Sequence, residues 1–196
     1  IKKYDEILVV GLGNEFATPD SLGAKVVQNI EITRHIKLYL PEAIDKNTRS
    51  VSAITPGVLG TTGIETIEIV KGIVDNIKPK LVIAIDSLCS KNIDRINKSI
   101  QISDTGIVPG GGVGNRQEEL SEETLGIPVI GVGIPTVLDA ATIVIDTLNN
   151  CDIKVSEGDI VNKMKLNNFN FIVTPKEIDS LIDSMSNIVS EGIPNV

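Results

Sequence analysis

Three short aliphatic runs, separated by segments with helical spacing, most constrain what this chain can fold into. The runs are Ile7 to Val10, Leu81 to Ile85 and Pro128 to Gly133. Unbroken runs of this length, rich in β-branched residues, are typical of parallel strands buried on both faces. Between the first two, Glu65 to Ile77 repeats apolar residues at helical spacing. This alternation predicts an α/β fold, a three-layer sandwich with helices on both faces of a mostly parallel or mixed sheet.

Length and composition agree with this fold class. The chain has 196 residues, of which 41% are hydrophobic and only 3% aromatic, with no Trp. A core of Ile, Val, Leu and Ala suits a parallel sheet covered by helices. Because neither an internal repeat nor a second core is evident, residues 1–196 are predicted to form a single α/β domain.

The charge balance excludes some classes of partner. The formal net charge is -8, and no cluster of Lys and Arg interrupts it, so direct binding of nucleic acid is not expected. No apolar segment has membrane length. Cys89 and Cys151 are too few for a disulfide framework in a chain this long. We therefore expect a reducing, cytoplasmic compartment and no membrane partner.

The first aliphatic run leads into a glycine turn and then an acidic helix start. Gly11-Leu12-Gly13-Asn14 is followed by Thr18-Pro19-Asp20. Thr18 suits an N-cap, Pro19 the first helical position, and Asp20 the first turn, where the helix dipole favours an anion. Phe16 stands where a dinucleotide-binding turn needs its third glycine, so that interpretation is set aside.

A second acid, Asp86, follows the run Leu81 to Ile85. Ligands of open α/β sheets bind in the crevice outside the carboxyl ends of the strands, so Asp20 and Asp86 are predicted to face each other there. Two carboxylates that share one water can hydrolyse a peptide bond if one is ionised and the other protonated. We expect the lower pKa at Asp20, on its helix start, and a pKa raised by burial at Asp86.

Other features suggest competing chemistries. Asp104-Thr105-Gly106 is the tripeptide of pepsin-like proteases, but here it opens the glycine-rich loop Thr105 to Asn115 of an α/β chain. That loop lacks the Lys-Ser/Thr of a phosphate-binding loop, which leaves an oxyanion-binding loop or a flexible connection. Cys89 and His35 are candidates for a thiol peptidase pair. Carboxylates with an imidazole could also hold a divalent metal, although no ligand spacing supports one and no cofactor is expected.

Several longer motifs, taken together, resemble the germination protease family of endospore-forming bacteria. The match covers nearly the whole chain except residues 150–168, a variable segment. The motifs are Gly11-Leu12-Gly13-Asn14, Thr18-Pro19-Asp20-Ser21-Leu22-Gly23, Thr33-Arg34-His35, Pro56-Gly57-Val58-Leu59-Gly60, Thr62-Gly63-Ile64-Glu65-Thr66, Ala84-Ile85-Asp86-Ser87-Leu88, Gln101-Ile102-Ser103-Asp104-Thr105-Gly106-Ile107, Gly112-Val113-Gly114-Asn115, Glu123-Thr124-Leu125-Gly126-Ile127-Pro128, Gly133-Ile134-Pro135-Thr136-Val137 and Val173-Thr174-Pro175-Lys176-Glu177.

The resemblance implies an aspartic-type endopeptidase that initiates degradation of small acid-soluble spore proteins during germination. It implies a spore-core enzyme made as a zymogen with an N-terminal propeptide, which this chain is expected to lack, and a homotetramer. The family's proposed catalytic aspartates correspond to Asp20 and Asp86. The fold is similar to that of hydrogenase maturation proteases, whose acids recognise a metal, so a metal-recognising maturation factor is an alternative.

The resemblance further implies cleavage after a glutamate, whose side chain should meet a cation. Arg34 and Arg116 are candidates, as are Lys91 and Arg95. Asp104 and Glu65 are additional candidates for substrate binding.

Overall fold

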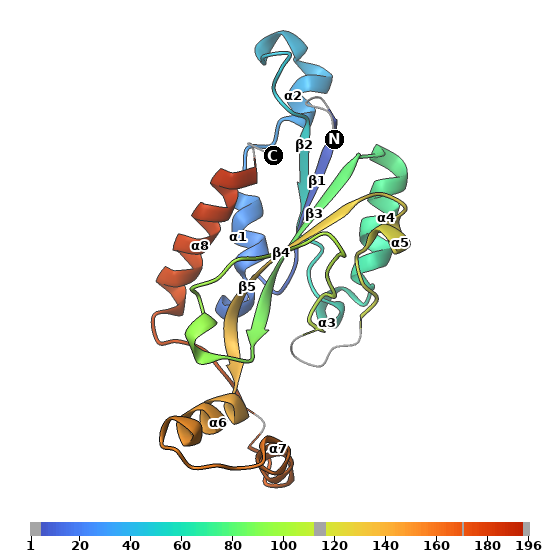
Figure 1. Ribbon diagram of the computed structural model, residues 1–196. Coiled ribbons are helices and arrows are strands. Elements are labelled where there is room, and N and C mark those ends of the chain that lie inside the picture. The colour runs from blue at the N-terminus through green and yellow to red at the C-terminus, as the bar shows by residue number, and fades with distance from the viewer. Residues whose placement is uncertain (1–4, 112–116, 170, 194–196) are drawn as a thin grey trace.

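The computed structural model describes residues 5–111, 117–169 and 171–193, and its centre is a six-stranded mixed sheet (Figure 1). The strand order is β2-β1-β3-β5-β4, with β6 paired to β5. Strands β2, β1, β3 and β5 are parallel, whereas β4 and β6 run antiparallel to β5. The strands are β1 (Ile7–Gly11), β2 (Val51–Ile54), β3 (Leu81–Ser90), β4 (Gln101–Ser103), β5 (Val129–Asp139) and β6 (Ile172–Val173). The predicted α/β fold is confirmed.

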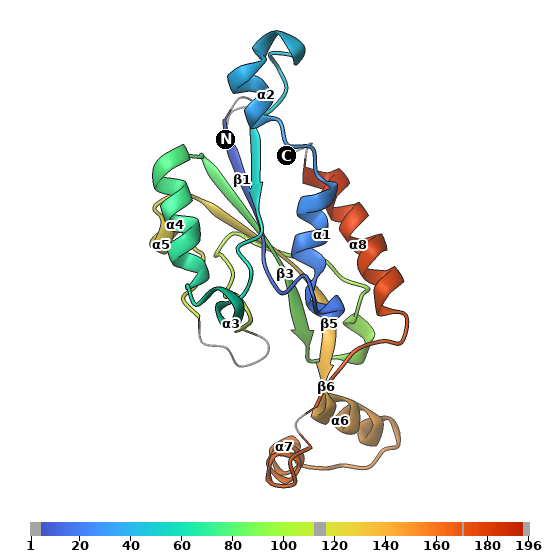
Figure 2. The same ribbon diagram turned by 180° about the vertical axis from the view of Figure 1, so that it is seen from behind.

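Helices cover both faces of the sheet. On one face α1 and α8 lie side by side, and on the other lie α4 and α5, as Figures 1 and 2 show from opposite sides. The α-helices are α1 (Leu22–Asn29), α2 (Arg34–Tyr39), α3 (Leu59–Thr62), α4 (Thr66–Ile77), α5 (Glu122–Leu125), α6 (Ala140–Asn150), α7 (Glu157–Leu166) and α8 (Ile178–Gly192). Short 3-10 turns are η1 (Thr18–Asp20), η2 (Pro41–Ala43) and η3 (Ile93–Arg95).

The aliphatic runs supply both layers of the core because their side chains alternate across the sheet. In β1, Ile7 and Val9 pack toward α1 and α8, whereas Leu8 and Val10 pack toward α4. All four side chains are at most 1% exposed. An apolar run without a polar break is therefore what this position in the sheet requires.

Two elements differ from the sequence-based expectation. Strand β3 continues past Asp86 to Ser90, and β5 continues to Asp139. The apolar residues from Thr136 to Leu148 predict a helix, but the helix begins only at Ala140. The two extensions pair with each other, with Cys89 opposite Val137. This pairing outweighs the helical pattern of the apolar residues after Thr136, and the Asp139 side chain then caps α6 by accepting from the Ala141 N–H at 2.7 Å.

Close backbone approach fixes α1 against the sheet. A Cβ on Gly23 would lie 2.5 Å from the Leu12 backbone and 2.6 Å from the Ile85 carbonyl oxygen. Only glycine allows α1 to start so near the carboxyl ends of β1 and β3. The start of α1 is thereby placed at the edge where the two predicted acids are expected.

Two helical segments project beyond the sheet at opposite ends (Figure 1). Helix α2 lies at the amino end, where the Thr33 N–H donates to the Val51 carbonyl. Helices α6 and α7 lie beyond the carboxyl end, and α7 falls within the variable segment 150–168. In the described ranges, every helix is too short or too polar to span a lipid bilayer.

Candidate active site

Asp86 lies at the point where the sheet opens. Strand β1 ends at Gly11, which is opposite Ile85, so Asp86 is the first β3 residue without a β1 neighbour. Its side chain is only 2% exposed. The Ser87 N–H donates to Oδ1 at 2.9 Å and the Gly110 N–H to Oδ2 at 3.4 Å. Burial, followed by the nearby negative charge of Asp20, raises the pKa of Asp86 to about 7 in spite of these two donors.

Asp20 occupies η1, one residue before Ser21, the N-cap of α1. Its Oδ2 accepts a hydrogen bond from the Asn14 N–H at 2.7 Å. Gly13, with φ of 97°, makes room for this contact, because a Cβ there would lie 3.0 Å from Asp20 Oδ1 and closer still to its carbonyl oxygen. The turn after β1 is thus shaped around the Asp20 carboxylate.

The expected helix position of Asp20 needs correction. We predicted Asp20 in the first turn of a helix, where the dipole favours the ionised carboxylate. Asp20 instead precedes α1, and burial raises its pKa while the Asn14 N–H opposes that rise. The structure brings both acids together as predicted. They line the same cavity, and the charge of Asp20 acts on Asp86.

Both acids line one cavity of about 300 Å³. Its wall is mostly apolar, with Thr66, Gln117 and Thr136 among the uncharged polar residues. The Thr66 hydroxyl donates to Gln117 Oε1 at 3.3 Å. Of the lining residues within the described ranges, none is Lys, Arg or His. The residues around the cavity are Leu12, Gly13, Ala17, Pro19, Asp20, Gly57, Val58, Thr66, Asp86, Ser87, Cys89, Pro109, Gly110, Gln117, Thr136, Val137 and Ile172.

Arg34, Asp104 and Glu65 do not line this cavity. Arg34, on α2, forms an ion pair with Glu6 at the amino end of the sheet, so the structure does not bring it to the acids. Asp104 is exposed after β4. Glu65 is the N-cap of α4, next to Thr66 of the cavity wall, and its buried Oε2 has no hydrogen-bond partner among the described residues. Arg116 lies outside the described residues.

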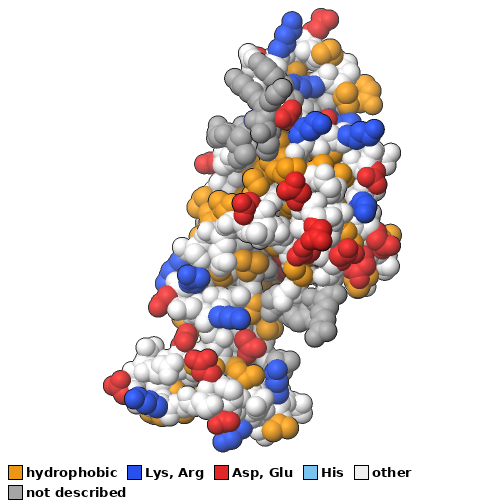
Figure 3. All heavy atoms as spheres, turned by 45° about the vertical axis from the view of Figure 1, so that its right-hand side comes forward, with side chains coloured by type: hydrophobic (Ala, Val, Ile, Leu, Met, Phe, Trp, Pro, Cys, Tyr) orange, Lys and Arg blue, Asp and Glu red, His pale blue; other side chains and the backbone are white. Residues whose placement is uncertain are grey.

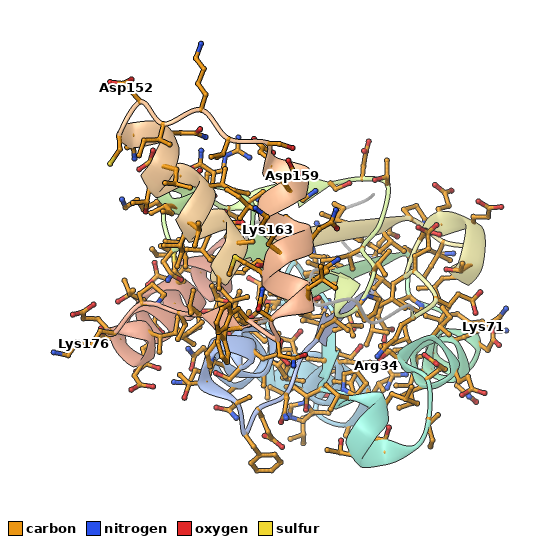
Figure 4. The ribbon with its side chains drawn as sticks, turned by 90° about the horizontal axis from the view of Figure 1, so that it is seen from below. Arg34, Lys71, Asp152, Asp159, Lys163 and Lys176 are labelled. Carbon is orange, nitrogen blue, oxygen red and sulfur yellow. The ribbon has the colours of Figure 1, made fainter. Side chains whose placement is uncertain are left out.

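Figure 4 views the molecule from the end where α6 and α7 lie. Asp159 and Lys163 are on α7, and Asp152 precedes that helix. All three side chains are exposed. They contribute nothing to the wall of the cavity.

Cys89 and His35 are not brought together. Cys89 lines the cavity near the carboxyl end of β3, and burial raises the pKa of its thiol, which disfavours the nucleophilic thiolate. His35 is exposed on α2 at the amino end of the sheet (Figure 1). A thiol nucleophile with this histidine as its base is incompatible with the fold.

The donor set does not fit a divalent metal ion. Over residues 5–111, 117–169 and 171–193, no three His, Cys, Asp or Glu side chains lie close enough together to hold one. A neutral carboxyl group is a poor ligand, and burial favours the neutral form of Asp86. We therefore derive no chemical step through a metal.

In the described part of the glycine-rich loop, one backbone N–H contacts an acid. The Gly110 N–H donates to Asp86, and the Gly111 N–H donates to the Val108 carbonyl at 3.1 Å. The oxyanion-binding interpretation therefore does not hold for these two amides, and residues 112–115 lie outside the described ranges. This contact could not be predicted from the sequence, because a backbone donor leaves no residue-type signal.

Comparison with known proteins gives a consistent family match. A family model described as germination protease matches residues 1–156. Similar proteins named germination protease include one from Clostridium tetani, 49% identical over 95% of this chain and 64% of that protein. One from Caldanaerobacter subterraneus subsp. tengcongensis is 48% identical over 98% and 66%, and one from Bacillus cytotoxicus is 40% identical over 98% and 67%. The chain spans about two thirds of their length.

Among solved structures, the chain is similar to the [NiFe] hydrogenase maturation protease HycI from Thermococcus kodakarensis. The sequence identity is 15% and the TM-score 0.47, over 97% of this chain and 91% of that one.

Proposed function

Because the chain belongs to the germination protease family, we propose that it is an endopeptidase in which Asp20 and Asp86 hydrolyse the peptide bond. The observation that carries this proposal is one cavity lined by two acids, of which Asp86 has a pKa raised to about 7. At neutral pH such a pair retains one proton in a substantial fraction of molecules. An acid and a base are then available in the same site.

The geometry suggests a division of roles. Neutral Asp86 donates its proton to the carbonyl oxygen of the scissile bond, while Asp20 accepts a proton from the water that attacks the carbonyl carbon. The tetrahedral intermediate breaks down when Asp20 passes that proton to the leaving nitrogen, and the C–N bond is cleaved. The hydroxyl proton returns to Asp86 as the carboxylic acid product forms. The pair ends in its starting protonation state.

We further propose that the substrates are small acid-soluble spore proteins, cleaved in the spore core at germination. Family membership supports this substrate class, as well as synthesis as a zymogen and assembly as a homotetramer. If the cleavage site contains a glutamate, the described cavity wall has no cation for it. Arg116 follows the glycine-rich loop and is next to Gln117 of the wall, which makes it the first candidate to test.

The decisive experiment is incubation with a small acid-soluble spore protein, followed by mass spectrometry of the products. We expect a limited set of cuts, and a loss of about 100-fold or more in rate for Asp20→Asn and Asp86→Asn, since each removes a proton-transfer group. His35→Ala should cleave normally. Wild-type rates in either Asn variant would contradict the carboxylate mechanism, as would a requirement for His35.

Removal of metal ions tests the same proposal independently. Because the two carboxylates lack a third ligand in the described ranges, cleavage should be unchanged after dialysis against EDTA. Elemental analysis should find no stoichiometric divalent ion. Loss of activity in EDTA with recovery on adding a single metal would instead favour a metal-dependent peptidase.

A further inference from the structure

The geometry points to Thr136 as a positioning residue for Asp20, with Thr174 supporting Thr136 from behind. This inference rests on the proposed role of Asp20 in peptide hydrolysis. It concerns two hydroxyl groups that approach the active site from β5 and from the segment after β6, far from Asp20 in sequence.

Thr136 is joined directly to the turn that carries Asp20. Its side chain is fully buried, at 0% exposure, and its hydroxyl donates to the Pro19 carbonyl at 2.6 Å. That carbonyl belongs to the peptide unit immediately before Asp20. The Asp20 N–H donates to the Ala17 carbonyl at 2.7 Å, and its carboxylate accepts from Asn14. Asp20 is therefore held through its side chain, its own N–H and the preceding carbonyl.

Thr174 extends this connection. Its hydroxyl donates to the Thr136 carbonyl at 2.9 Å. The same region is closed by pairing of Leu138 with Val173 and by the Ala140 N–H, which donates to the Phe171 carbonyl at 2.9 Å. The root of the projecting α6–α7 segment is thus linked by hydrogen bonds to η1.

Such a link affects catalysis more than substrate binding. The Thr136 hydroxyl bond joins η1 directly to β5. Strand β5 pairs with β3, and β3 carries Asp86. A small movement of η1 would change the separation of the two acids while leaving the cavity open. Misplacement of a catalytic group by about 1 Å can cost on the order of 100-fold in rate.

The test is the series Thr136→Val, Thr136→Ser and Thr174→Val in the full chain, assayed with the proposed spore-protein substrate. Valine keeps the shape of threonine but has no hydroxyl, so Thr136→Val should lower kcat by about 10- to 100-fold with little change in KM. Thr136→Ser should restore most of the activity. Thr174→Val should lower kcat less than Thr136→Val does.

The pH–rate profile provides a readout that a loss of stability would not move. The groups acting on Asp86 are the charge of Asp20 and the N–H groups of Ser87 and Gly110. If Asp20 moves away, its contribution to the raised pKa of Asp86 shrinks, so the alkaline limb should shift to lower pH in Thr136→Val. Thr136→Ser should return the limb toward the wild-type position.

Thr33→Val is the matched control. Thr33 is also a buried threonine, 3% exposed, whose hydroxyl donates to the Arg49 carbonyl, but it lies at the amino end of the sheet. This variant should lose thermal stability without a change in kcat or in the pH profile. If Thr136→Val does not fold, Thr174→Val carries the same test.

The inference is overturned if both threonine variants of the site keep kcat within twofold of wild type while Asp20→Asn is inactive. It is also overturned if Thr136→Val loses activity only in proportion to its loss of folded protein. An active Asp20→Asn would instead contradict the proposed function itself, so the two failures are distinguishable.

Discussion

A buried carboxyl group is costly to ionise, and at Asp86 this cost raises the pKa. Two backbone N–H groups stabilise its charged form, yet burial and the charge of Asp20 outweigh them and raise the pKa to about 7. An ordinary exposed aspartate would be ionised at neutral pH and unable to donate a proton. Burial, followed by the charge of Asp20, therefore favours the protonated form of Asp86.

This raised pKa predicts a specific pH dependence of stability. The folded state holds the Asp86 proton more tightly than the unfolded state, so this contribution is full below pH 3.8, falls as the pH rises, and is lost above about pH 7. Asp86→Asn removes it. The free energy of unfolding of Asp86→Asn relative to wild type should therefore increase by about 2–3 kcal/mol from pH 5 to pH 8. Urea unfolding at several pH values measures this difference, and a flat difference would contradict the assignment.

The rate of cleavage should depend on the ionisation of the same group, Asp86. In the proposed mechanism, cleavage needs neutral Asp86 together with ionised Asp20, so kcat/KM should fall as the pH rises through about 7, where Asp86 loses its proton. On the acid side the rate should fall as Asp20 becomes protonated. Because the two acids interact, the two limbs describe the pair. A rate that rises continuously to pH 9 would exclude Asp86 as the proton donor.

At the scale of elements, the turn from β1 to η1 depends on one glycine. A Cβ at Gly13 would collide with the Asp20 carbonyl, and its φ of 97° disfavours any other residue. Gly13→Ala should cost about 1–3 kcal/mol in stability and should also lower kcat, because η1 has to move. Thermal unfolding and single-turnover cleavage measure the two effects.

Gly72→Ala is the control for that substitution. Gly72 lies on the exposed side of α4, and an added Cβ meets nothing within 4 Å. Alanine in a helix interior should leave cleavage unchanged and stabilise the fold by about 0.5–1 kcal/mol. Equal effects of the two substitutions would mean that the turn tolerates a side chain at Gly13.

Helices α7 and α8 should differ sharply in local stability. Every residue of α7 is at least partly exposed, whereas α8 buries Ile178, Ile182 and Val189 against α1 and the sheet. Opening of α7 therefore exposes little apolar surface. Hydrogen exchange should be at least about 10-fold faster for α7 amides than for those in the middle of α8. Similar protection would show that α7 packs against a surface beyond this chain.

These elements also show how far sequence reasoning reaches. The pairing of Asp20 with Asp86 was predictable, because each follows an aliphatic run and parallel strands bring their carboxyl ends to one edge. The contribution of Thr136 was not, because the apolar residues after it suggest a helix. Its strand conformation depends on its neighbours, Pro135 and Val137, which pair with the extension of β3. The hydrogen bond from the Gly110 N–H to Asp86 was likewise not predictable from the sequence, because any residue except proline supplies that donor.

On the scale of the whole molecule, the two catalytic candidates lie in a strongly acidic protein. The formal net charge is -8, and the face that brings α4 and α5 forward shows many Asp and Glu side chains (Figure 3). Glu118, Glu119, Glu122 and Glu123 are exposed in and around α5. They follow Gln117, which lines the cavity. Negative charge therefore lies close to the cavity as well as over the rest of the surface.

This negative charge predicts how salt should affect cleavage of charged peptides. Like charges slow association at low ionic strength, and salt screens them over a Debye length of roughly 8–10 Å near physiological ionic strength. With a peptide that carries additional glutamates away from the cleavage site, kcat/KM should rise about threefold between 20 and 200 mM NaCl. A matched peptide with lysines at those positions should show the reverse. If the acidic peptide is cleaved more slowly as salt increases, a local cation outweighs the acidic surface, and Arg116→Gln then tests whether this residue supplies it.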